Sequence, residues 1–175
     1  GLLELERYAN PNESEEWGAL CKEYAFLKHK YSLEPIDGTL WKHGRMRPQN
    51  APEGRVRQLA QLLYQTEFMY SRAMACDSVT AMRELLTLQP VVTDTAMPIA
   101  PAPPIGKDAI DSLIINVIVP YQYAAGKQEQ ALRILEALPA EKNSIIRQWQ
   151  TLGQLVRNAA DSQALIHLYQ TCCQS

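Results

Sequence analysis

The chain has 175 residues, of which 46% are hydrophobic and 21% are charged, and its formal net charge is −2. This length suits one domain that buries a core without disulfide bonds or metal ions, and the composition excludes disordered and fibrous proteins. The longest nearly apolar run, residues 113–119, is far shorter than the roughly 20 residues of a membrane span. The first residues are acidic and lack a basic leader, so we expect a cytoplasmic protein without a membrane partner.

The charge is unevenly distributed along the chain. Residues 1–40 carry eight acidic and four basic side chains, whereas residues 41–58 carry five basic side chains and one acidic one. Residues 41–58 therefore form a local cationic segment in an otherwise acidic chain, and they are the first candidate for a binding surface.

The N-terminal region predicts helices. Ser14 has the position of an N-cap before residues 15–31, and the apolar side chains of that stretch share one helical face: Trp17, Leu20, Cys21, Tyr24, Leu27 and Tyr31. Residues 2–8 also have a helical rhythm but no cap. From that pattern we expect the chain to begin inside a helix and to be the C-terminal part of a longer protein.

A second helix is predicted from Asn50, which has capping-box spacing to Glu53, with Pro52 in the first turn. Its predicted buried stripe consists of Val56, Leu59, Ala60 and Leu63. Arg55 borders this stripe, whereas Arg57 and Gln58 lie well off it. We therefore expect Arg55 to be the more buried of the two arginines and Arg57 to face solvent.

The middle of the chain contains one capped helix and one proline-rich stretch. Asp77 is the predicted N-cap of a helix to about Thr87, with Val79, Met82 and Leu86 inward. The prolines of residues 90–106 exclude a helix or a central strand there. We expect an extended connection, and it is the place where the single domain of residues 1–175 could have a seam.

Residues 107–126 allow two interpretations. Their β-branched centre resembles a buried strand, but the length between Asp108 and Gly126 favours a central helix that is apolar almost all round. Pro120 cannot donate to the carbonyl of Asn116, so we expect a kink there. The Asn116 side chain could then bond the freed backbone.

Three shorter helices are predicted in the C-terminal region, and their apolar stripes are Ala131, Ile134, Leu135 and Leu138; Ile145, Trp149 and Leu152; and Leu165, Leu168, Tyr169 and Cys172. Asp161 is the predicted N-cap of the last one. Short connections favour antiparallel neighbours. The predicted fold is all-α, an irregular bundle or stacked helical hairpins of about six to seven helices, with a solenoid as a weak alternative.

The sequence offers no catalytic constellation. His29, His43 and His167 lack metal-ligand spacing, and the cysteines form no CxxC pair. Asp161 and Ser162 lie five or six positions from His167 on one predicted helix, so these groups do not converge. We therefore predict no catalytic residue, no metal site and no cofactor.

The cationic segment allows two interpretations. Its candidate anion-binding or nucleic-acid-binding residues are Trp41, Lys42, Arg45, Arg47, Arg55 and Arg57, because cations beside an aromatic ring suit phosphates and unpaired bases. Alternatively, Arg45, Arg47 and Arg55 bond the carbonyls of an irregular loop and pair with the acidic N-terminal region. We favour this scaffold interpretation.

Five blocks in this order resemble a bacterial family known as domain of unknown function 2851: "EYAFLKHKYSLEP", "WKHGRMRPQNAPEGRVRQLAQLL", "LIINVIVPYQYAAG", "ALRILEALPAEKNSIIRQWQTLG" and "NAADSQALIHLY". The resemblance implies a longer parent protein whose N-terminal part is similar to restriction-endonuclease-like folds. It implies no established activity. Besides Trp41, Lys42, Arg45, Arg47 and Arg55 of the cationic segment, the positions that match the family signature are Pro48, Gln58, Asn116, Pro120, Asp161, Ser162 and Gln163.

Two functions follow as hypotheses. The first is a non-catalytic accessory helical domain that packs against, or assists, the N-terminal nuclease-like domain of its parent protein. The alternative is a module that binds nucleic acid or another polyanion through residues 41–58.

Overall fold

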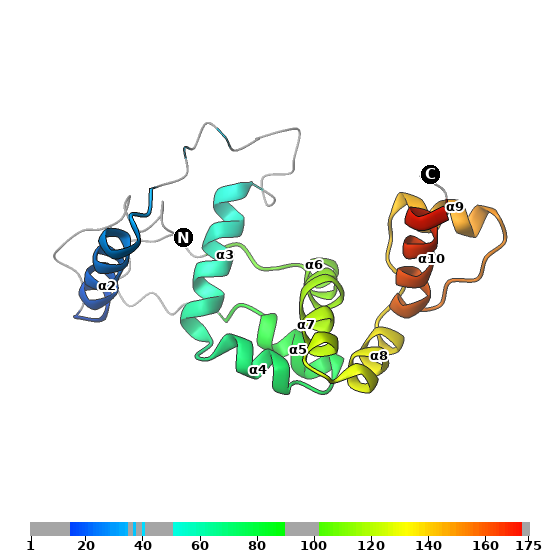
Figure 1. Ribbon diagram of the computed structural model, residues 1–175, viewed down its shortest axis with the longest axis horizontal. Coiled ribbons are helices and arrows are strands. Elements are labelled where there is room, and N and C mark those ends of the chain that lie inside the picture. Colours follow the sequence, from blue (N-terminus) through cyan, green and yellow to red (C-terminus); the bar gives the residue numbers. More distant parts are fainter. Residues whose placement is uncertain (1–14, 35–36, 38–39, 41–50, 90–101, 173–175) are drawn as a thin grey trace. The chain divides into compact units, whose positions relative to one another are not determined.

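The computed structural model describes residues 15–34, 37, 40, 51–89 and 102–172 (Figure 1). The chain divides into two compact units, the first of residues 1–67 and 88–104 and the second of residues 68–87 and 105–175. Every regular element within the described ranges is a helix, and the one β-type pairing is an isolated bridge between Pro139 and Asn158. The predicted all-α class is therefore confirmed.

The first unit contains helix α2, Glu15–Tyr31. Of its predicted stripe, Cys21, Tyr24 and Leu27 are half-buried, whereas Tyr31 is exposed. The predicted N-cap Ser14 lies outside the described residues, as do the side chains of Trp17 and Leu20. Lys28, His29 and Lys30 occupy the last turn, where positive charge complements the helix dipole.

Helix α3, Pro52–Gln65, begins with proline in its first turn, as expected, but its N-cap is Ala51 and makes no side-chain cap bond. The predicted cap Asn50 lies outside the described residues. Gly54, Gln58, Leu62 and Thr66 are the buried positions, and they recur every four residues along one face.

The predicted apolar stripe of α3 was wrong. Val56 is half-buried, Ala60 is exposed, and Leu59 and Leu63 are 56% and 53% exposed. The face that packs is the one with glutamines, because it lies against residues 89 and 102–104, whose backbone groups need hydrogen-bond partners. The spacing of apolar residues cannot predict that a helix face packs in order to supply hydrogen bonds to another segment's backbone.

The second unit starts with two short helices, α4 (Met69–Ala75) and α5 (Val79–Leu86). Helix α4 was not predicted, since its N-cap is Phe68 in the left-handed region (φ 53°) without a capping side chain. The N-cap of α5 is Ser78, whose hydroxyl accepts from the Ala81 N–H, and the predicted cap Asp77 was wrong by one residue. Met82 and Leu86 are buried as expected.

Residues 107–124 form one continuous helix rather than a strand. It consists of α6 (Lys107–Leu113), a π-helical turn η3 (Ile114–Ile118) and α7 (Val119–Ala124). The π turn precedes Pro120, and in it the Val119 N–H bonds the Ile114 carbonyl five residues back. The widened turn lies where the kink was predicted, and the helix ends in a Schellman motif at Gly126 (φ 87°).

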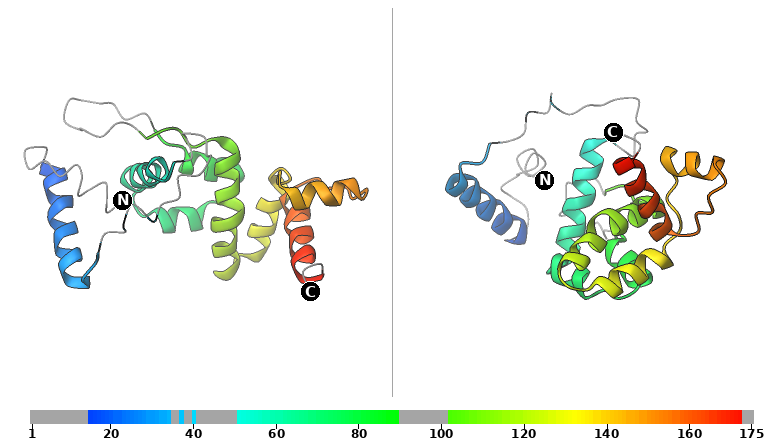
Figure 2. Two further views of the ribbon diagram at one scale, coloured as in Figure 1. Left: turned by 90° about the horizontal axis from the view of Figure 1, so that it is seen from above. Right: turned by 45° about the vertical axis from the view of Figure 1, so that its right-hand side comes forward.

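The remaining helices are α8 (Gln128–Ala137), α9 (Ser144–Thr151) and α10 (Ala159–Cys172). Helix α10 packs on both α8 and α9, as the views in Figure 2 show. The predicted stripe of α8 is confirmed, with Ala131, Ile134 and Leu138 buried and Leu135 half-buried.

The stripes predicted for α9 and α10 were only partly right. Ile146 is the buried residue of α9, whereas Leu152 lies beyond the helix end and is 74% exposed. In α10 the buried residues are Ala159 and Ser162, and the predicted apolar positions Leu165 and Tyr169 are half-buried. The N-terminal turn of α10 therefore packs more tightly than its C-terminal half.

The core of the second unit joins these helices. It is built from α5, the helix of residues 107–124, α8 and the first residues of α9 and α10, with these fully or almost fully buried apolar side chains: Met82, Leu86, Ile110, Ile114, Ile118, Ile134, Leu138 and Ile146. None of the helices in the described ranges combines the length and hydropathy that a membrane crossing requires.

Candidate functional site

Most of the cationic segment lies outside the described residues: Trp41, Lys42, Arg45, Arg47 and Pro48. The two arginines of α3 are described. Arg55 is exposed and donates from Nη1 to Oε1 of Gln58 at 2.9 Å, whereas Arg57 is half-buried. The expected order of burial was therefore wrong, because the face of α3 that packs differs from the apolar stripe.

The Arg57 guanidinium carries a buried Nε without a hydrogen-bond partner among the described residues. A buried donor on a cation is costly when it is unpaired. Arg55, by contrast, bonds a side chain of its own helix, which is not the backbone-carbonyl or acidic contact that the scaffold interpretation expected.

Three glutamines of α3 bond the backbone of the proline-rich region, and we call Gln58, Gln61 and Gln65 the glutamine row. Gln58 is buried and donates from Nε2 to the carbonyls of Pro103 (2.8 Å) and Pro104 (3.3 Å). These carbonyls belong to a stretch whose prolines have no N–H, so side-chain amides supply the missing donors.

Another cluster caps the C-terminal end of α4. Gln122 is fully buried and donates from Nε2 to the carbonyls of Ala73 and Cys76, each at 2.9 Å. Gln130 donates to the same Cys76 carbonyl at 2.6 Å, and Lys127 donates to the Met74 carbonyl at 2.7 Å. Helix ends leave carbonyls unsatisfied, and here residues about 50 positions later in the chain satisfy them.

An ion pair joins α5 to α6. Arg83 donates from Nε and Nη2 to the two carboxylate oxygens of Asp111 at 2.7 and 2.9 Å, and Asp111 is 5% exposed. The bidentate geometry is the strong form of such a pair. The hydrogen bond to Asp111 raises the pKa of Arg83 above its ordinary value, so the guanidinium stays charged.

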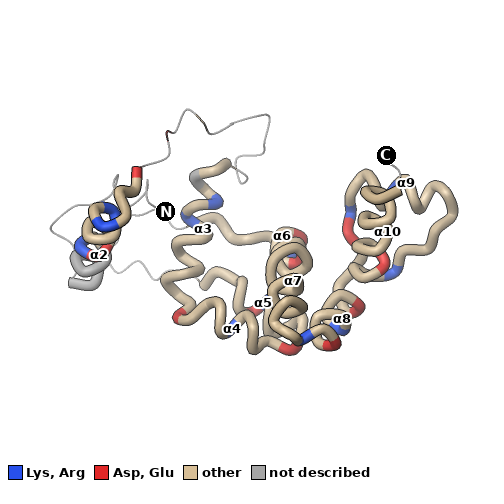
Figure 3. Tube along the Cα trace, viewed as in Figure 1, with Lys and Arg blue, Asp and Glu red and all other residues tan. Residues whose placement is uncertain are grey.

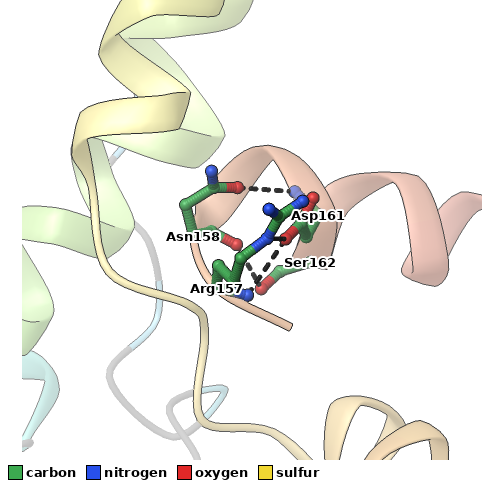
Figure 4. A network of polar contacts seen from close by, with 4 residues as sticks. All are labelled: Arg157, Asn158, Asp161 and Ser162. Carbon is green, nitrogen blue, oxygen red and sulfur yellow. Dashed lines mark hydrogen bonds and ion pairs between the residues drawn. The ribbon is translucent and has the colours of Figure 1, made fainter. Parts of the chain in front are cut away.

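The first turn of α10 holds a polar network (Figure 4). Asn158 accepts from the Asp161 N–H at 2.9 Å, and Asp161 accepts from the Arg157 N–H at 3.0 Å. The prediction that Asp161 is the N-cap was therefore wrong: Asp161 lies three residues past the capping Asn158, and its carboxylate accepts from the N–H of the residue before that cap. The backbone hydrogen bond from Arg157 lowers the pKa of Asp161.

The neighbouring Ser162 and Gln163 hold the connection between α8 and α9. The Ser162 hydroxyl donates to the Asn158 carbonyl and accepts from the Glu141 N–H at 3.0 Å. Gln163 donates from Nε2 to the Glu141 carboxylate. In these contacts Asp161, Ser162 and Gln163 act as structural groups.

The helix of residues 107–124 presents an uncharged outer face. No charged residue occurs between Asp111 and Lys127, as Figure 3 shows, and the exposed residues there include Leu113, Val117, Pro120 and Tyr121. Tyr70 of α4 meets Tyr121 edge to face with ring centroids 6.2 Å apart. We call Leu113, Asn116, Val117, Pro120 and Tyr121, together with Tyr70, the uncharged face.

Asn116 lies on this face, and its side-chain amide donates to the Ser112 carbonyl at 2.9 Å. Asn116 thus bonds backbone of its own helix, as expected, but the carbonyl it bonds lies four residues before it and is not the Asn116 carbonyl that Pro120 deprives of a donor. Asn116 and Pro120 are both uncharged, so this exposed part of the helix has no charged side chain.

Groups that could hold a metal ion, three or more of His, Cys, Asp and Glu together, do not occur in the described ranges. His29 and His167 are exposed, and His43 lies outside these ranges. Cys21, Cys76 and Cys172 are free thiols, and burial raises the pKa of Cys76, which makes it a poor nucleophile.

The fold is thus an all-α scaffold whose polar side chains mainly bond backbone. The chain belongs to the family described as "Protein of unknown function (DUF2851)", whose model matches residues 1–144. Arg55, Gln58, Asn116 and Pro120 lie within this range, whereas Asp161, Ser162 and Gln163 lie beyond it. No curated protein and no solved structure matches the chain.

Sequence reasoning missed several of the polar residues that organise the fold. No sequence motif distinguishes the glutamines involved, because glutamine on a helix is usually exposed to solvent. They are Gln61, Gln65, Gln122 and Gln130. Arg83 and Asp111 were also missed, because 28 residues separate them. The sequence did give one signal for the uncharged face, the absence of charged residues from Ser112 to Gly126. That pattern predicted a buried helix, whereas one face of the helix is exposed.

Proposed function

We propose that this chain is a non-catalytic accessory helical domain that packs against the N-terminal, nuclease-like part of its parent protein. The observation that carries the proposal is the uncharged face of the helix of residues 107–124. Exposed surfaces normally mix both charges, and a contiguous exposed apolar patch marks a place where another protein binds.

The contacts of the family-signature residues support a scaffold role. Gln58 bonds the carbonyls of residues 103 and 104 and accepts a hydrogen bond from Arg55, and Asn116 bonds its own helix backbone. Side chains that are engaged in this way have few free donors or acceptors for substrate. The residues left over for recognition are the aromatic and aliphatic ones, which dominate the centres of protein interfaces.

The test measures association between this chain and the separately produced N-terminal region of the parent protein, by isothermal titration calorimetry. Val117→Glu and Tyr121→Glu should each weaken binding by at least about tenfold, because a buried charge at an interface costs more than 1.4 kcal/mol. Tyr123→Glu is the matched control, since Tyr123 is also exposed and lies about 200° around the helix from Tyr121.

Circular dichroism should show that all three variants keep the helical content of the parent chain. Absence of binding by the unmodified chain would reject the proposal. Equal weakening by the control would reject the uncharged face as the contact surface.

The alternative, binding of nucleic acid or another polyanion, has one observation in its favour, the unpartnered Nε of Arg57. The assay is fluorescence anisotropy with single- and double-stranded DNA at several salt concentrations. Binding through phosphates should weaken steeply with salt, and Arg57→Gln together with Lys42→Gln should reduce that salt dependence. Undetectable or salt-insensitive binding would exclude this function.

We also propose a bacterial cytoplasmic location. Cys21, Cys76 and Cys172 are free, which is the usual state of cysteines in a reducing compartment. Fractionation of the bacterium that encodes the parent protein, with an antibody to this chain, would test the location.

A further inference from the structure

The glutamine row also connects two separate passages of the chain. Gln61 donates from Nε2 to the Gln89 carbonyl at 2.8 Å and accepts at Oε1 from the Ala102 N–H at 3.3 Å. One side-chain amide therefore bonds the last described residue before residues 90–101 and the first described residue after them. The two backbone atoms lie within about 9 Å of each other, given hydrogen-bond and amide dimensions.

The other two glutamines extend the contact in both directions. Gln65 accepts at Oε1 from the Gln89 N–H at 3.0 Å, so both backbone groups of Gln89 bond to α3. Gln58 holds the carbonyls of Pro103 and Pro104. We call residues 102–104 the strap.

The backbone of the strap makes no helix or strand hydrogen bonds and has few N–H donors. Pro103 and Pro104 have no N–H, and residues 102–106 form neither helix nor strand. The bonds that Gln61 and Gln65 make with Gln89 are exposed to water. Exposed hydrogen bonds open readily, so contacts of this kind belong to the less stable part of a fold.

We propose that the glutamine row is a clamp that keeps the two ends of residues 90–101 together, and that Gln89 and the strap leave α3 as one unit when the clamp opens. The reason is that Gln61 is shared: it bonds Gln89 on one side and Ala102 on the other. The clamp rather than the sequence of residues 90–101 then determines where Gln89 and Ala102 bind to α3.

The key variant is Gln61→Glu in the full chain at pH 7. A carboxylate still accepts from the Ala102 N–H but cannot donate to the Gln89 carbonyl. The Gln89 N–H keeps its own acceptor on Gln65. Both N–H groups therefore retain their direct partners, and only a joint release exposes both of them.

The readout is the exchange of these two amide protons with solvent, measured by NMR. We expect both to exchange at least about tenfold faster in Gln61→Glu, the factor that corresponds to the loss of one hydrogen bond. At about pH 3.5 the glutamate becomes protonated and can donate again, so protection should return. Gln150→Glu, at an exposed position of α9, is the matched control and should change neither proton.

A second variant tests the role of residues 90–101. A Gly-Ser linker of about four residues can bridge about 9 Å, because an extended chain spans about 3.3 Å per residue. Replacement of residues 90–101 by this linker should leave the exchange of both protons unchanged.

Two results would overturn the proposal. The first is unchanged exchange of both protons, or faster exchange of only one, in Gln61→Glu at pH 7. The second is loss of protection at Gln89 and Ala102 in the linker variant while its circular dichroism stays that of the parent chain.

Discussion

The ion pair between Arg83 and Asp111 is expected to be a major brace between α5 and α6. Its removal is best tested with Arg83→Met, which preserves much of the apolar stem and leaves the Asp111 carboxylate without its partner. Breaking a buried ion pair costs about 3–5 kcal/mol of unfolding free energy. The Arg83 side chain is 30% exposed and the Asp111 side chain 7%, so we expect about 2–3 kcal/mol, less than for a fully buried pair.

Urea denaturation followed by far-UV circular dichroism measures this change. In a chain of this size the expected loss corresponds to a fall in Tm of about 5–10 °C. Arg133→Met is the matched control, because Arg133 is paired with Glu129 at 3.8 Å on the surface and should lose at most about 0.5 kcal/mol.

A double-mutant cycle measures the interaction energy between Arg83 and Asp111 separately from the contacts that each makes with other residues. Asp111→Asn alone should cost about 1–2 kcal/mol, since an amide keeps one acceptor for the guanidinium. Arg83→Met combined with Asp111→Asn should cost less than the two single losses together, because no unpaired charge remains. Additivity within about 0.5 kcal/mol would refute the reasoning.

The pH dependence of this brace follows from the direction of the Arg83 pKa shift. A base whose pKa is raised on folding contributes its full stability below its unfolded pKa, which for arginine lies far above neutral pH, and loses that stability only as the pH rises through the folded pKa. The difference between the parent chain and Arg83→Met should therefore stay constant from pH 7 to pH 9. A decrease over this range would contradict the assignment.

Three further predictions concern the other polar contacts. Gln122→Leu should destabilise the chain by about 1–3 kcal/mol in urea, because the buried Ala73 carbonyl loses its donor, and a neutral effect would show that this bond is unimportant. Asn143→Ala should cost about 1 kcal/mol through loss of the α9 cap, whereas Asn143→Ser should be nearly neutral; equal losses would argue against capping. Asp161 has a lowered pKa, so its stabilisation is present above its ordinary pKa of 3.8 and lost as pH falls through the lower folded value. The carboxyl chemical shift of Asp161 should show a midpoint below 3.8, and Asp161→Asn should remove this part of the acid dependence.

The helical class and most of the helix positions could be predicted from the sequence, for local reasons. Apolar spacing located the inward residues of α5 and α8, such as Met82 and Ile134, because these faces pack against other apolar faces. Gly126 marked a helix end, and it adopts the positive φ, 87°, that favours glycine there. The π turn before Pro120 was anticipated only as an interruption of the helix.

Much less of the candidate site could be predicted, and α3 shows why. Its apolar positions Leu59 and Leu63 suggested one buried face, but the chain buries Gln58 instead, since unpaired carbonyls at Pro103 and Pro104 need donors. These carbonyls belong to residues about 45 positions away, so the sequence of α3 contains no pattern that would predict the burial of Gln58.

The sequence by itself therefore determined the all-α class and the helix end at Gly126, because these features rest on contacts within a few residues, and the order of its sequence blocks identified the family. The tertiary structure alone decided which face of each helix is covered. It also decided which polar groups meet, as in Arg83 with Asp111 and Gln122 with Ala73, because backbone groups and charges must be satisfied by whatever packs beside them.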